Sequence, residues 1–448
     1  MHNRTEQFLN DPVFPLLIRM SAPNTIAFFI QAIVVLAEVW FISKLGTTSL
    51  AAVALAFPVI MLTQQMAFGA LGGAVTSSIA RSLGAEDKER AEKLLWHSLL
   101  LSCCGYLLFF LIFFIGGENL LMALGGEGLL LEESLLYIKI FLTGAIFIWL
   151  SGMLSAALRG IGNMRFPALL MIVGSGIQVI LAGGLILGWF GLPKLGIIGA
   201  PLSAISVAAL MAIVMILKFM HSSSNVQLKL SNLSFKKELF RDIFNVALPA
   251  SLAPIFTVGT ILILTGLVGQ FGVSALAGYG IGSRIEFLMI PLVFGIGTAM
   301  TTMVGTNIGA KKVERAERIG WLGGSFAGLF SGMIGLMLIL SSSYWINFFA
   351  TDQATYEVTK QYIEIVGLCF TFQGLGLSLY FASQGANAMK WPIIATVIRF
   401  VVAALGGWIA VNWFSSGIAG VFYAAASAMT IYGVMLVLSL KLGAWRSN

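Results

Sequence analysis

Apolar runs of about twenty residues recur along almost the whole chain, separated by short breaks of glycine, proline and charged residues. Each run matches the ~20 residues that a helix needs to cross about 30 Å of hydrocarbon. The pattern predicts an all-α membrane protein with twelve transmembrane spans, at residues 13–43, 48–78, 90–115, 129–157, 166–189, 195–218, 240–271, 274–305, 316–348, 356–383, 391–413 and 417–440.

The composition agrees with this pattern and excludes several classes of function. Of the 448 residues 58% are hydrophobic and only 10% are charged, whereas about a quarter of a soluble domain is charged. The three cysteines lie inside apolar runs and the three histidines are scattered near ends and loops, so no metal site is predicted. The phosphate-binding motif GxxxxGK[ST] is missing from the sequence, so ATP is not expected to be the energy source within this chain. We expect neither an enzyme nor a bound cofactor.

The polar start leads directly into the first span, which predicts that no signal peptide is cleaved.

The positions of lysine and arginine predict the orientation in the membrane. If both termini are cytoplasmic, most of the 26 basic residues lie on the inner side, as the positive-inside rule requires. The outer side then holds only Lys44, Lys139, Lys194 and Lys360. The net charge of +7 is therefore interpreted as a topology signal, and no nucleic-acid partner is expected.

The two halves of the sequence repeat each other. The segment "LGAEDKERAE" (83–92) is matched by "IGAKKVERAE" (308–317). At the same offset "LRGIGNMRFP" (158–167) is matched by "SQGANAMKWP" (383–392), and "YIKI" (137–140) by "YIEI" (362–365). Several matches in one register indicate an internal duplication.

The repeat predicts the domain organisation. Pro23 is matched by Pro249, and the longest polar stretch falls between the two halves. We therefore predict an N-terminal six-helix lobe (1–218), a cytoplasmic linker (219–239) and a C-terminal six-helix lobe (240–448). Because six is even, the repeats have the same orientation in the membrane, as in transporters whose two lobes rock around a central site. A scaffold without transport activity is the alternative.

One carboxylate, Glu38, lies inside the first span, six residues before the Lys44–Gly46 turn. At 1.5 Å per residue this is about 9 Å from the outer end of the helix. An unpaired charge there costs on the order of 2.5 kcal/mol or more, which makes such residues candidates for function. Burial favours the neutral form and a nearby cation the charged form. Glu38 is therefore a candidate for proton coupling through competition with a cationic substrate, and a permanent interhelical hydrogen bond is the structural alternative.

Pro23 precedes Glu38 by fifteen residues in the same span. A proline inside a helix removes a backbone hydrogen bond and introduces a kink. Pro23 is therefore a candidate hinge of the first helix, and a static kink is the alternative.

A second set of charges is predicted in the eighth and eleventh spans. Glu286 lies near the membrane midplane, and Arg284 is about 200° round the same helix, so these two do not face each other. Arg399 is the better candidate partner for Glu286. The three residues are interpreted either as a structural ion pair or as a second ion-handling site.

Other side chains are of the types that line adaptable binding pockets. In a chain with 19 Met and 33 Phe, contact with lipid or core is the alternative for each of them. The candidates for a substrate cleft are Trp40, Gln64, Met66, Phe68, Tyr279 and Glu286.

The sequence resembles the multidrug and toxic compound extrusion (MATE) family over essentially its whole length. The resemblance is carried by "APNTIAFFIQAIVVLAEVWFISKLGTTSLAAVALAFP", by the paired "GA…ERAE" loops, by "LRGIGNMRFP" and by "SALAGYGIGSRIEFLMIPLVFGIGTAM". It implies two six-helix lobes around a V-shaped cleft, and export of organic cations, drugs or metabolites in exchange for protons or sodium ions.

The resemblance also assigns roles to residues. The first-helix carboxylate of the family, normally an aspartate, falls at Glu38. In the prokaryotic subgroup related to DNA-damage-inducible transporters, which this sequence resembles most, an Asn and an Asp of the fifth span match Gln178 and Ala182, and an Asn of the fourth span matches Ser155. Glu38, Gln178 and Ser155 offer few oxygen ligands for a sodium ion, whereas a proton needs only one carboxylate. Proton coupling is therefore favoured.

These observations together predict a secondary antiporter of the cytoplasmic membrane of a prokaryote that exports a small amphipathic, cationic compound. Its partners are the small-molecule substrate and the lipid bilayer, and a monomer is expected. The alternatives are sodium-coupled antiport, a flippase for lipid-linked precursors, and a receptor or scaffold derived from a transporter.

Overall fold

The computed structural model describes residues 4–221, 226–286, 289–349 and 352–446, which are largely helical and include no strand. In the first half the helices are α1 (Arg4–Asn10), α2 (Val13–Ser43), α3 (Thr47–Gln64), the π-helix η1 (Gln65–Leu71), α4 (Gly72–Gly84), α5 (Lys88–Ala123), α6 (Gly128–Gly160), α7 (Arg165–Leu187), the 3₁₀ turns η2 (Trp189–Gly191) and η3 (Gly196–Ile198), and α8 (Gly199–Met220). There follow the 3₁₀ turn η4 (Leu230–Asn232), α9 (Lys237–Gly269), α10 (Val273–Glu286), α11 (Ile290–Gly309), α12 (Val313–Leu340), α13 (Ser342–Phe349), α14 (Gln353–Val366), the 3₁₀ turn η5 (Gly367–Cys369), α15 (Phe370–Gly385), α16 (Lys390–Asn412) and α17 (Gly417–Lys441).

Twelve stretches of helix in the described residues are long and apolar enough to cross a membrane, which confirms the predicted number of spans. Several ends differ from the prediction. The third span was expected to end at residue 115, but α5 continues through Gly116 and Gly117 to Ala123. It ends just before Gly125, whose φ of 95° is left-handed. The end of this helix is therefore set by a residue that adopts the left-handed conformation, and not by the end of the apolar run.

Several predicted spans correspond to more than one helical element, among them the eighth and the ninth. The eighth, expected at 274–305, includes residues 287–288, which lie outside the described residues; α10 and α11 lie on either side of them. The ninth, expected at 316–348, is divided into α12 and α13 at Ser341. The Ser341 hydroxyl donates a hydrogen bond to the Met337 carbonyl across 2.6 Å, the kind of local bond that competes with a regular helix.

The chain forms two compact units. The N-terminal unit consists of residues 26–247, and the C-terminal unit consists of residues 248–448 together with residues 1–25. One boundary lies inside α2, two residues after Pro23, and the other inside α9, directly before Leu248 and Pro249. The first turns of α2 therefore belong to the C-terminal unit, and the start of α9 belongs to the N-terminal unit. The division into lobes at a linker of residues 219–239 stays a prediction.

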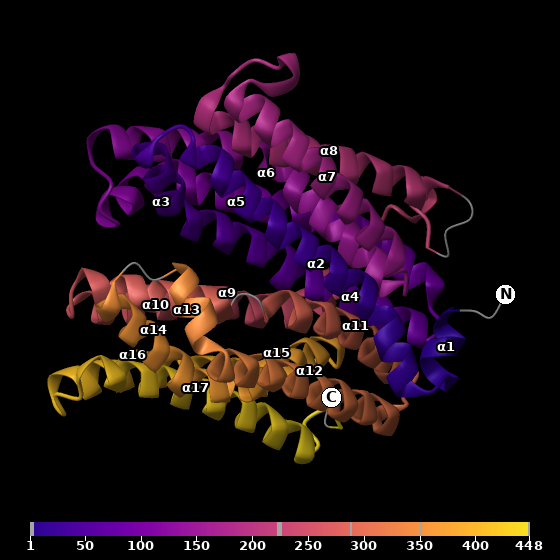
Figure 1. Ribbon diagram of the computed structural model, residues 1–448. Helices are drawn as coiled ribbons and strands as arrows, with labels where there is room; N and C mark the ends of the chain where they lie inside the picture. The colour runs from indigo at the N-terminus through magenta and orange to yellow at the C-terminus, as the bar shows by residue number, and fades with distance from the viewer. Residues whose placement is uncertain (1–3, 222–225, 287–288, 350–351, 447–448) are drawn as a thin grey trace. The chain divides into compact units, whose positions relative to one another are not determined.

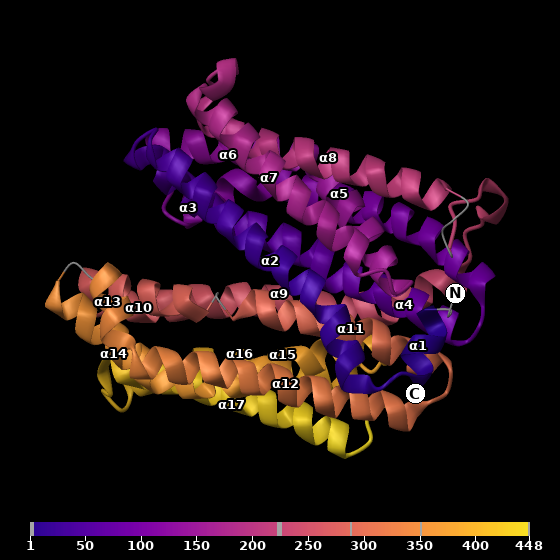
Figure 2. The same cartoon turned by 45° about the vertical axis from the view of Figure 1, so that its right-hand side comes forward.

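Within each unit the helices pack side by side as a bundle (Figures 1 and 2). In the N-terminal unit α6 contacts α3, α4, α5 and α8, and α7 packs against α8. In the C-terminal unit α15 contacts α11, α12 and α17, while α10 packs against α14 and α16 against α17. A core of buried apolar side chains from α9, α10, α11, α12, α14 and α17 fills the interior of that unit.

The repeat seen in the sequence is also present in the backbone. Glu86 and Lys311, which are matched in the repeat, both have left-handed φ, at 61° and 58°. Gly162 and Asn387, another matched pair, have φ of 77° and 58°. Left-handed backbone is uncommon outside glycine, so its recurrence at matched positions shows that the two halves make the same turns. The sequence repeat therefore corresponds to a structural repeat.

Candidate functional site

Glu38 lies in the last third of α2 and is held by a side chain from α7. The Gln178 amide Nε2 donates a hydrogen bond to Glu38 Oε1 across 2.8 Å. Gln178 is 8% exposed and Glu38 is half-buried. Ser203 of α8 lies within interaction range of the same carboxyl group, and the Tyr137 hydroxyl of α6 is close enough for an electrostatic interaction with it. Four helices of the N-terminal unit thus meet at this carboxyl group.

A second polar contact between α2 and α7 sets their register. The Ser175 hydroxyl donates a hydrogen bond to Gln31 Oε1 across 3.1 Å. Gln31 is seven residues before Glu38, so it lies on the same face of α2, about two turns away. Hydrogen bonds between helices in a membrane contribute roughly 0.6 to 2 kcal/mol each. This contact brings the two helices together so that Glu38 meets Gln178.

The Gln178 amide can form a hydrogen bond with the Glu38 carboxyl group in either protonation state of that group. In the structure the amide N–H donates to Oε1, a contact that a charged carboxylate accepts. When the carboxyl group is protonated, it can donate to the carbonyl oxygen of the same amide after the amide turns over, because glutamine carries both donors and an acceptor. Both protonation states of Glu38 therefore find a partner without movement of the helices.

The structure corrects the expectation that Ser155 joins this cluster. The Ser155 hydroxyl accepts a hydrogen bond from Arg159 Nη1 across 3.0 Å. It is eighteen residues beyond Tyr137 on α6, which is about 27 Å along the helix axis. Ser203, from the sixth span, lies near the carboxyl group instead. The match of Ser155 to a family motif compares positions in the sequence. It therefore gives no information on how far Ser155 lies from Glu38 in the folded chain.

Pro23 lies where α2 is anchored to α11. Next to it, the Asn24 side-chain amide donates to Thr298 Oγ1 across 3.3 Å. Gly295 is so close to the backbone of Thr25 that an added Cβ would collide with it. The segment before the unit boundary is thus fixed by backbone-to-backbone packing. The role of Pro23 as a hinge stays a prediction.

Tyrosines at equivalent positions of the two repeats each lie against a carboxyl group. Tyr362 Oη donates a hydrogen bond to Glu286 Oε2 across 3.2 Å, and Tyr137, at the matched position of the first repeat, lies near Glu38. We did not select either tyrosine from the sequence as a site residue. The paired motifs "YIKI" and "YIEI" contain both and were the available signal.

Arg399 has partners other than Glu286. Its guanidinium donates to Gln373 Oε1 across 3.4 Å and to Thr257 Oγ1 across 3.2 Å, and it lies 5.1 Å from the centre of the Tyr432 ring. In the part of the chain that the structure describes, no ion pair within 4.0 Å joins Glu286 to Arg399 or Arg284. The Arg399 charge acts on Glu286 from a longer distance. The C-terminal unit thus holds an arginine where α9 and α16 meet, and the N-terminal unit holds a carboxylate where α2 and α7 meet.

The cleft candidates lie in different surroundings. Tyr279, 7% exposed, packs on Tyr362 and Phe422 in the core of the C-terminal unit. Met66, 5% exposed, is on the π-helix η1. Phe68, also on η1, is half-buried against Gly152 of α6. The other candidates from the first half are more exposed. Trp40 is half-exposed, and Lys44 Nζ lies 4.8 Å from the centre of its ring. Gln64 is exposed at the end of α3. Met66 and Tyr279 therefore serve packing inside their units, and Trp40 and Gln64 stay candidates.

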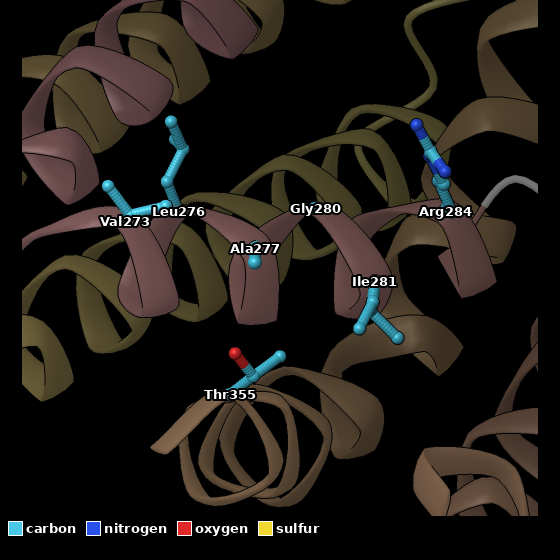
Figure 3. A pocket seen from close by; sticks show the side chains of 7 residues that line it. All are labelled: Val273, Leu276, Ala277, Gly280, Ile281, Arg284 and Thr355. Carbon is cyan, nitrogen blue, oxygen red and sulfur yellow. The ribbon is translucent and has the colours of Figure 1, made fainter. Parts of the chain in front are cut away.

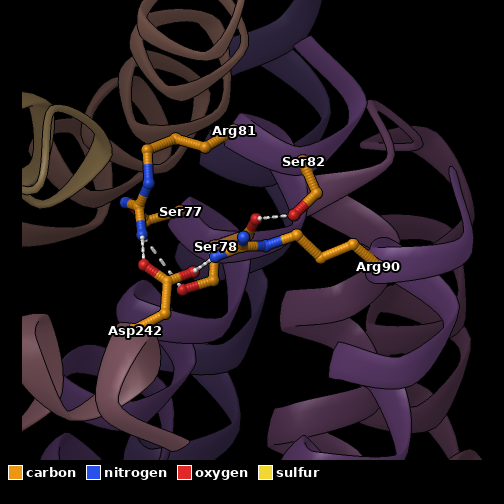
Figure 4. Close-up of polar contacts among 6 residues, drawn as sticks. All are labelled: Ser77, Ser78, Arg81, Ser82, Arg90 and Asp242. Carbon is orange, nitrogen blue, oxygen red and sulfur yellow. Dashed lines mark hydrogen bonds and ion pairs between the residues drawn. The ribbon is translucent and has the colours of Figure 1, made fainter. Parts of the chain in front are cut away.

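A cluster of charges fixes the start of α9 to the N-terminal unit (Figure 4). Asp242 Oδ1 pairs with Arg81 Nη2 across 2.6 Å, and Oδ2 pairs with Arg90 Nη2 across 3.2 Å. Arg81 lies near the end of α4 and also donates to the hydroxyl groups of Ser77 and Ser78. No local pattern in the sequence indicates this cluster, because it joins positions far apart in the chain. It makes the first turns of α9 part of the N-terminal unit.

A duplicated bundle of twelve spans, with a hydrogen-bonded carboxylate inside its first long helix, defines a secondary membrane transporter. The profile of the MatE family matches two segments of the chain, residues 23–182 and 249–409. These segments begin at Pro23 and Pro249, in the register of the internal repeat. The chain belongs to the MatE family, the MATE family that its sequence resembles, and is a transporter rather than an enzyme.

Several known proteins are similar over nearly the full length. The probable multidrug resistance protein NorM of Thermotoga maritima is 24% identical, with 96% of this chain and 93% of that protein covered. An FAD transporter of Shewanella oneidensis is 26% identical, with 90% of each covered. A solved transporter of the MOP superfamily from Pyrococcus furiosus, described as having a binding pocket of reverse polarity, has the same fold, with a TM-score of 0.92 at 24% identity and coverage of 99% of this chain and 98% of that one.

Proposed function

We propose that this protein is an antiporter that exports small amphipathic organic compounds in exchange for protons, with Glu38 as the proton-carrying group. The observation that carries the proposal is the hydrogen bond between Gln178 and Glu38 inside the helical bundle. Relatives named for multidrug resistance and for FAD transport support an organic substrate.

The proposed cycle follows from the surroundings of Glu38. When water reaches the cluster, the carboxylate is solvated and accepts the Gln178 N–H, so the proton can leave. When water is excluded, the neutral form of Glu38 is favoured. The carboxyl group then keeps its proton while the transporter switches between its inward-facing and outward-facing conformations. Exchange is coupled if the substrate binds best to the conformation in which Glu38 has lost its proton, since linkage then acts in both directions.

Sodium coupling is the alternative that the same carboxylate allows. A hard cation takes several oxygen ligands. Without Ser155, the side chains near Glu38 are Gln178, which presents its N–H, together with Ser203 and Tyr137. Ser203 and Tyr137 each offer one hydroxyl oxygen, and Gln178 presents its N–H to the carboxyl group, whereas a proton needs only the carboxylate itself; this supports the proton. A flippase is less well supported, because an anionic headgroup calls for a cluster of basic residues; Arg399 is already engaged by Gln373 and Thr257, which leaves Arg284 as a single arginine and not a cluster.

The proposal includes a location. We infer that the protein lies in the inner membrane of a prokaryote with both termini in the cytoplasm, because that orientation places most basic residues of the connecting segments inside.

The test is transport by the purified full-length protein in proteoliposomes. A pH gradient or a sodium gradient is imposed separately, and flux of two fluorescent probes is followed, the cation ethidium and the anion anilinonaphthalene sulfonate. Flux of either probe that responds to the pH gradient, with no response to sodium at fixed pH, is expected. A response to sodium alone would replace the proton by sodium, and no gradient-dependent flux of either probe would overturn the proposal.

A further inference from the structure

Helix α10 is packed on one face and open on the opposite face. On the packed face, a Cβ added at Gly278 would come within 2.7 Å of Val358, and one added at Gly282 within 2.5 Å of Tyr362, both on α14. Glu286, one turn further along, accepts the hydrogen bond from Tyr362. The residues at 278, 282 and 286 therefore bind α10 to α14.

The open face of α10 forms a groove (Figure 3). Its residues from α10 are Val273, Leu276, Ala277, Gly280, Ile281 and Arg284, and Thr355 of α14 completes the lining. The groove is shallow and widely open, with a volume of about 440 Å³. At Gly280 no atom lies within 4 Å of an added Cβ, so the middle of the groove is open space. We call this the α10 groove.

One charged side chain, Arg284, belongs to the α10 groove. It is exposed, and in the described part of the chain its guanidinium forms no ion pair and donates no hydrogen bond. It lies eleven residues after Val273, which is about 16 Å from the start of the helix. An arginine at such a depth is costly in hydrocarbon, so this face of α10 must meet water or an anion. Its five N–H donors fit a carboxylate, phosphate or sulfonate.

We propose that the α10 groove binds the substrate, that the substrate is an amphipathic organic anion, and that Arg284 pairs with its acidic group while Leu276, Ile281 and Val273 cover its apolar body. The inference rests on the proposed transport function and replaces the cation expected from the sequence. A structural lipid fits less well, because its phosphate belongs at the membrane surface and Arg284 lies about 16 Å from the start of α10 at Val273.

The placement of the groove changes how coupling works. The groove is built from α10 and α14 of the C-terminal unit, whereas the neighbours of Glu38 come from α6, α7 and α8 of the N-terminal unit. An anion at Arg284 does not compete with a proton for the same charge. Substrate and proton are therefore linked through the conformation each one favours, and not through direct displacement.

The first measurement is fluorescence titration of the full-length protein in nanodiscs with a matched pair of probes. Anilinonaphthalene sulfonate carries the acid, and phenylnaphthylamine has the same aromatic body without it; empty nanodiscs supply the background. We expect saturable binding of the sulfonate that Arg284→Gln weakens about tenfold or more and Arg284→Lys weakens less. Binding of the neutral probe should be the same in all three. Lys390→Gln removes one positive charge elsewhere in the same unit and should change neither probe.

A second variant tests the groove itself. Gly280→Leu places a side chain in the open space without a clash, so it should weaken both probes equally while the protein stays folded. Equal sulfonate affinity in the unaltered protein and Arg284→Gln, or no saturable sulfonate binding above empty nanodiscs, would overturn the inference. So would displacement of the sulfonate by anionic lipid but not by soluble naphthalene sulfonate, which would assign the groove to lipid.

The two proposals fail in different ways. If a pH gradient drives probe flux but Arg284→Gln leaves sulfonate affinity unchanged, only the proposed anion site is contradicted. If sulfonate binding depends on Arg284 but no gradient drives flux, the transport function is lost, and with it the assignment of the groove to a substrate.

Discussion

Gln178 donates a 2.8 Å hydrogen bond to the carboxylate of Glu38, from α7 to α2. The two residues are 140 positions apart in the sequence, and the contact lies wholly within the N-terminal unit. Since Ser203 and Tyr137 also come from that unit, the chemistry proposed for Glu38 is contained in one bundle. Single substitutions can therefore separate this chemistry from the structural role of the same contacts.

Replacement of Glu38 by Gln should abolish transport driven by a pH gradient and preserve exchange of labelled for unlabelled probe without a gradient. Glutamine keeps the shape and can still accept the Gln178 N–H, but it cannot take up a proton. Both activities are measured in proteoliposomes. Glu118→Gln, which alters an exposed acid of α5, is the matched control and should change neither. Retention of pH-driven transport in Glu38→Gln would rule out the coupling role.

Replacement of Gln178 by Ala should move the pH dependence of transport upward by about one unit. The amide N–H stabilises the charged carboxylate, so its removal favours the protonated form, and a higher pH is needed to release the proton. The readout is the pH of half-maximal probe flux. Gln31→Ala removes the hydrogen bond from Ser175 of α7 to α2 and should lower stability without moving this pH. A downward shift in Gln178→Ala would contradict the assignment.

Replacement of Pro23 or Pro249 by Ala should slow transport and leave probe binding unchanged. Both prolines lie inside the helices that pass from one unit to the other, within three residues of the boundary, and alanine restores a regular helix there. Transport rate and binding affinity are measured separately. Pro58→Ala alters a proline inside α3, within one unit, and should leave the rate unchanged. An equal loss of rate in all three variants would indicate a general effect on folding.

Replacement of Asp242 by Asn should destabilise the protein by about 3 kcal/mol, since it leaves Arg81 without its carboxylate partner in a mostly buried place. Thermal unfolding of the purified protein measures the change. Glu89→Gln alters the exposed pair with Lys93 and should leave the unfolding temperature unchanged. The double exchange Arg81→Asp with Asp242→Arg should recover part of the lost stability. No change in Asp242→Asn would show that the pair is solvated rather than structural.

Some parts of the fold were readable from local sequence. The number of spans follows from apolar runs of the right length, because hydrocarbon accepts a helix only when its length and composition suit the membrane. The repeat was visible in matched loops, and the left-handed residues Glu86 and Lys311 show that those loops share one geometry. Glu38 was selected as the site because a carboxylate inside a span is costly, which is a property of position along one helix.

The side chains that surround Glu38 could not be predicted from local sequence patterns. Ser155 was matched to a motif but lies about 27 Å along α6 from the tyrosine near Glu38, while Ser203 was not considered and lies near it. Asp242 was not selected from the sequence, and it pairs with two arginines of α4 and α5.

The class of the protein, the twelve spans, the duplication and the position of the intramembrane acid could all be predicted from the sequence, because each is expressed in short local patterns of residues, the duplication as two such patterns that match. The side chains that meet Glu38, the packed and open faces of α10 and the boundary between the two units became known from the tertiary structure alone. These depend on how helices far apart in the sequence are turned and set against each other, and packing of side chains across the bundle selects that arrangement.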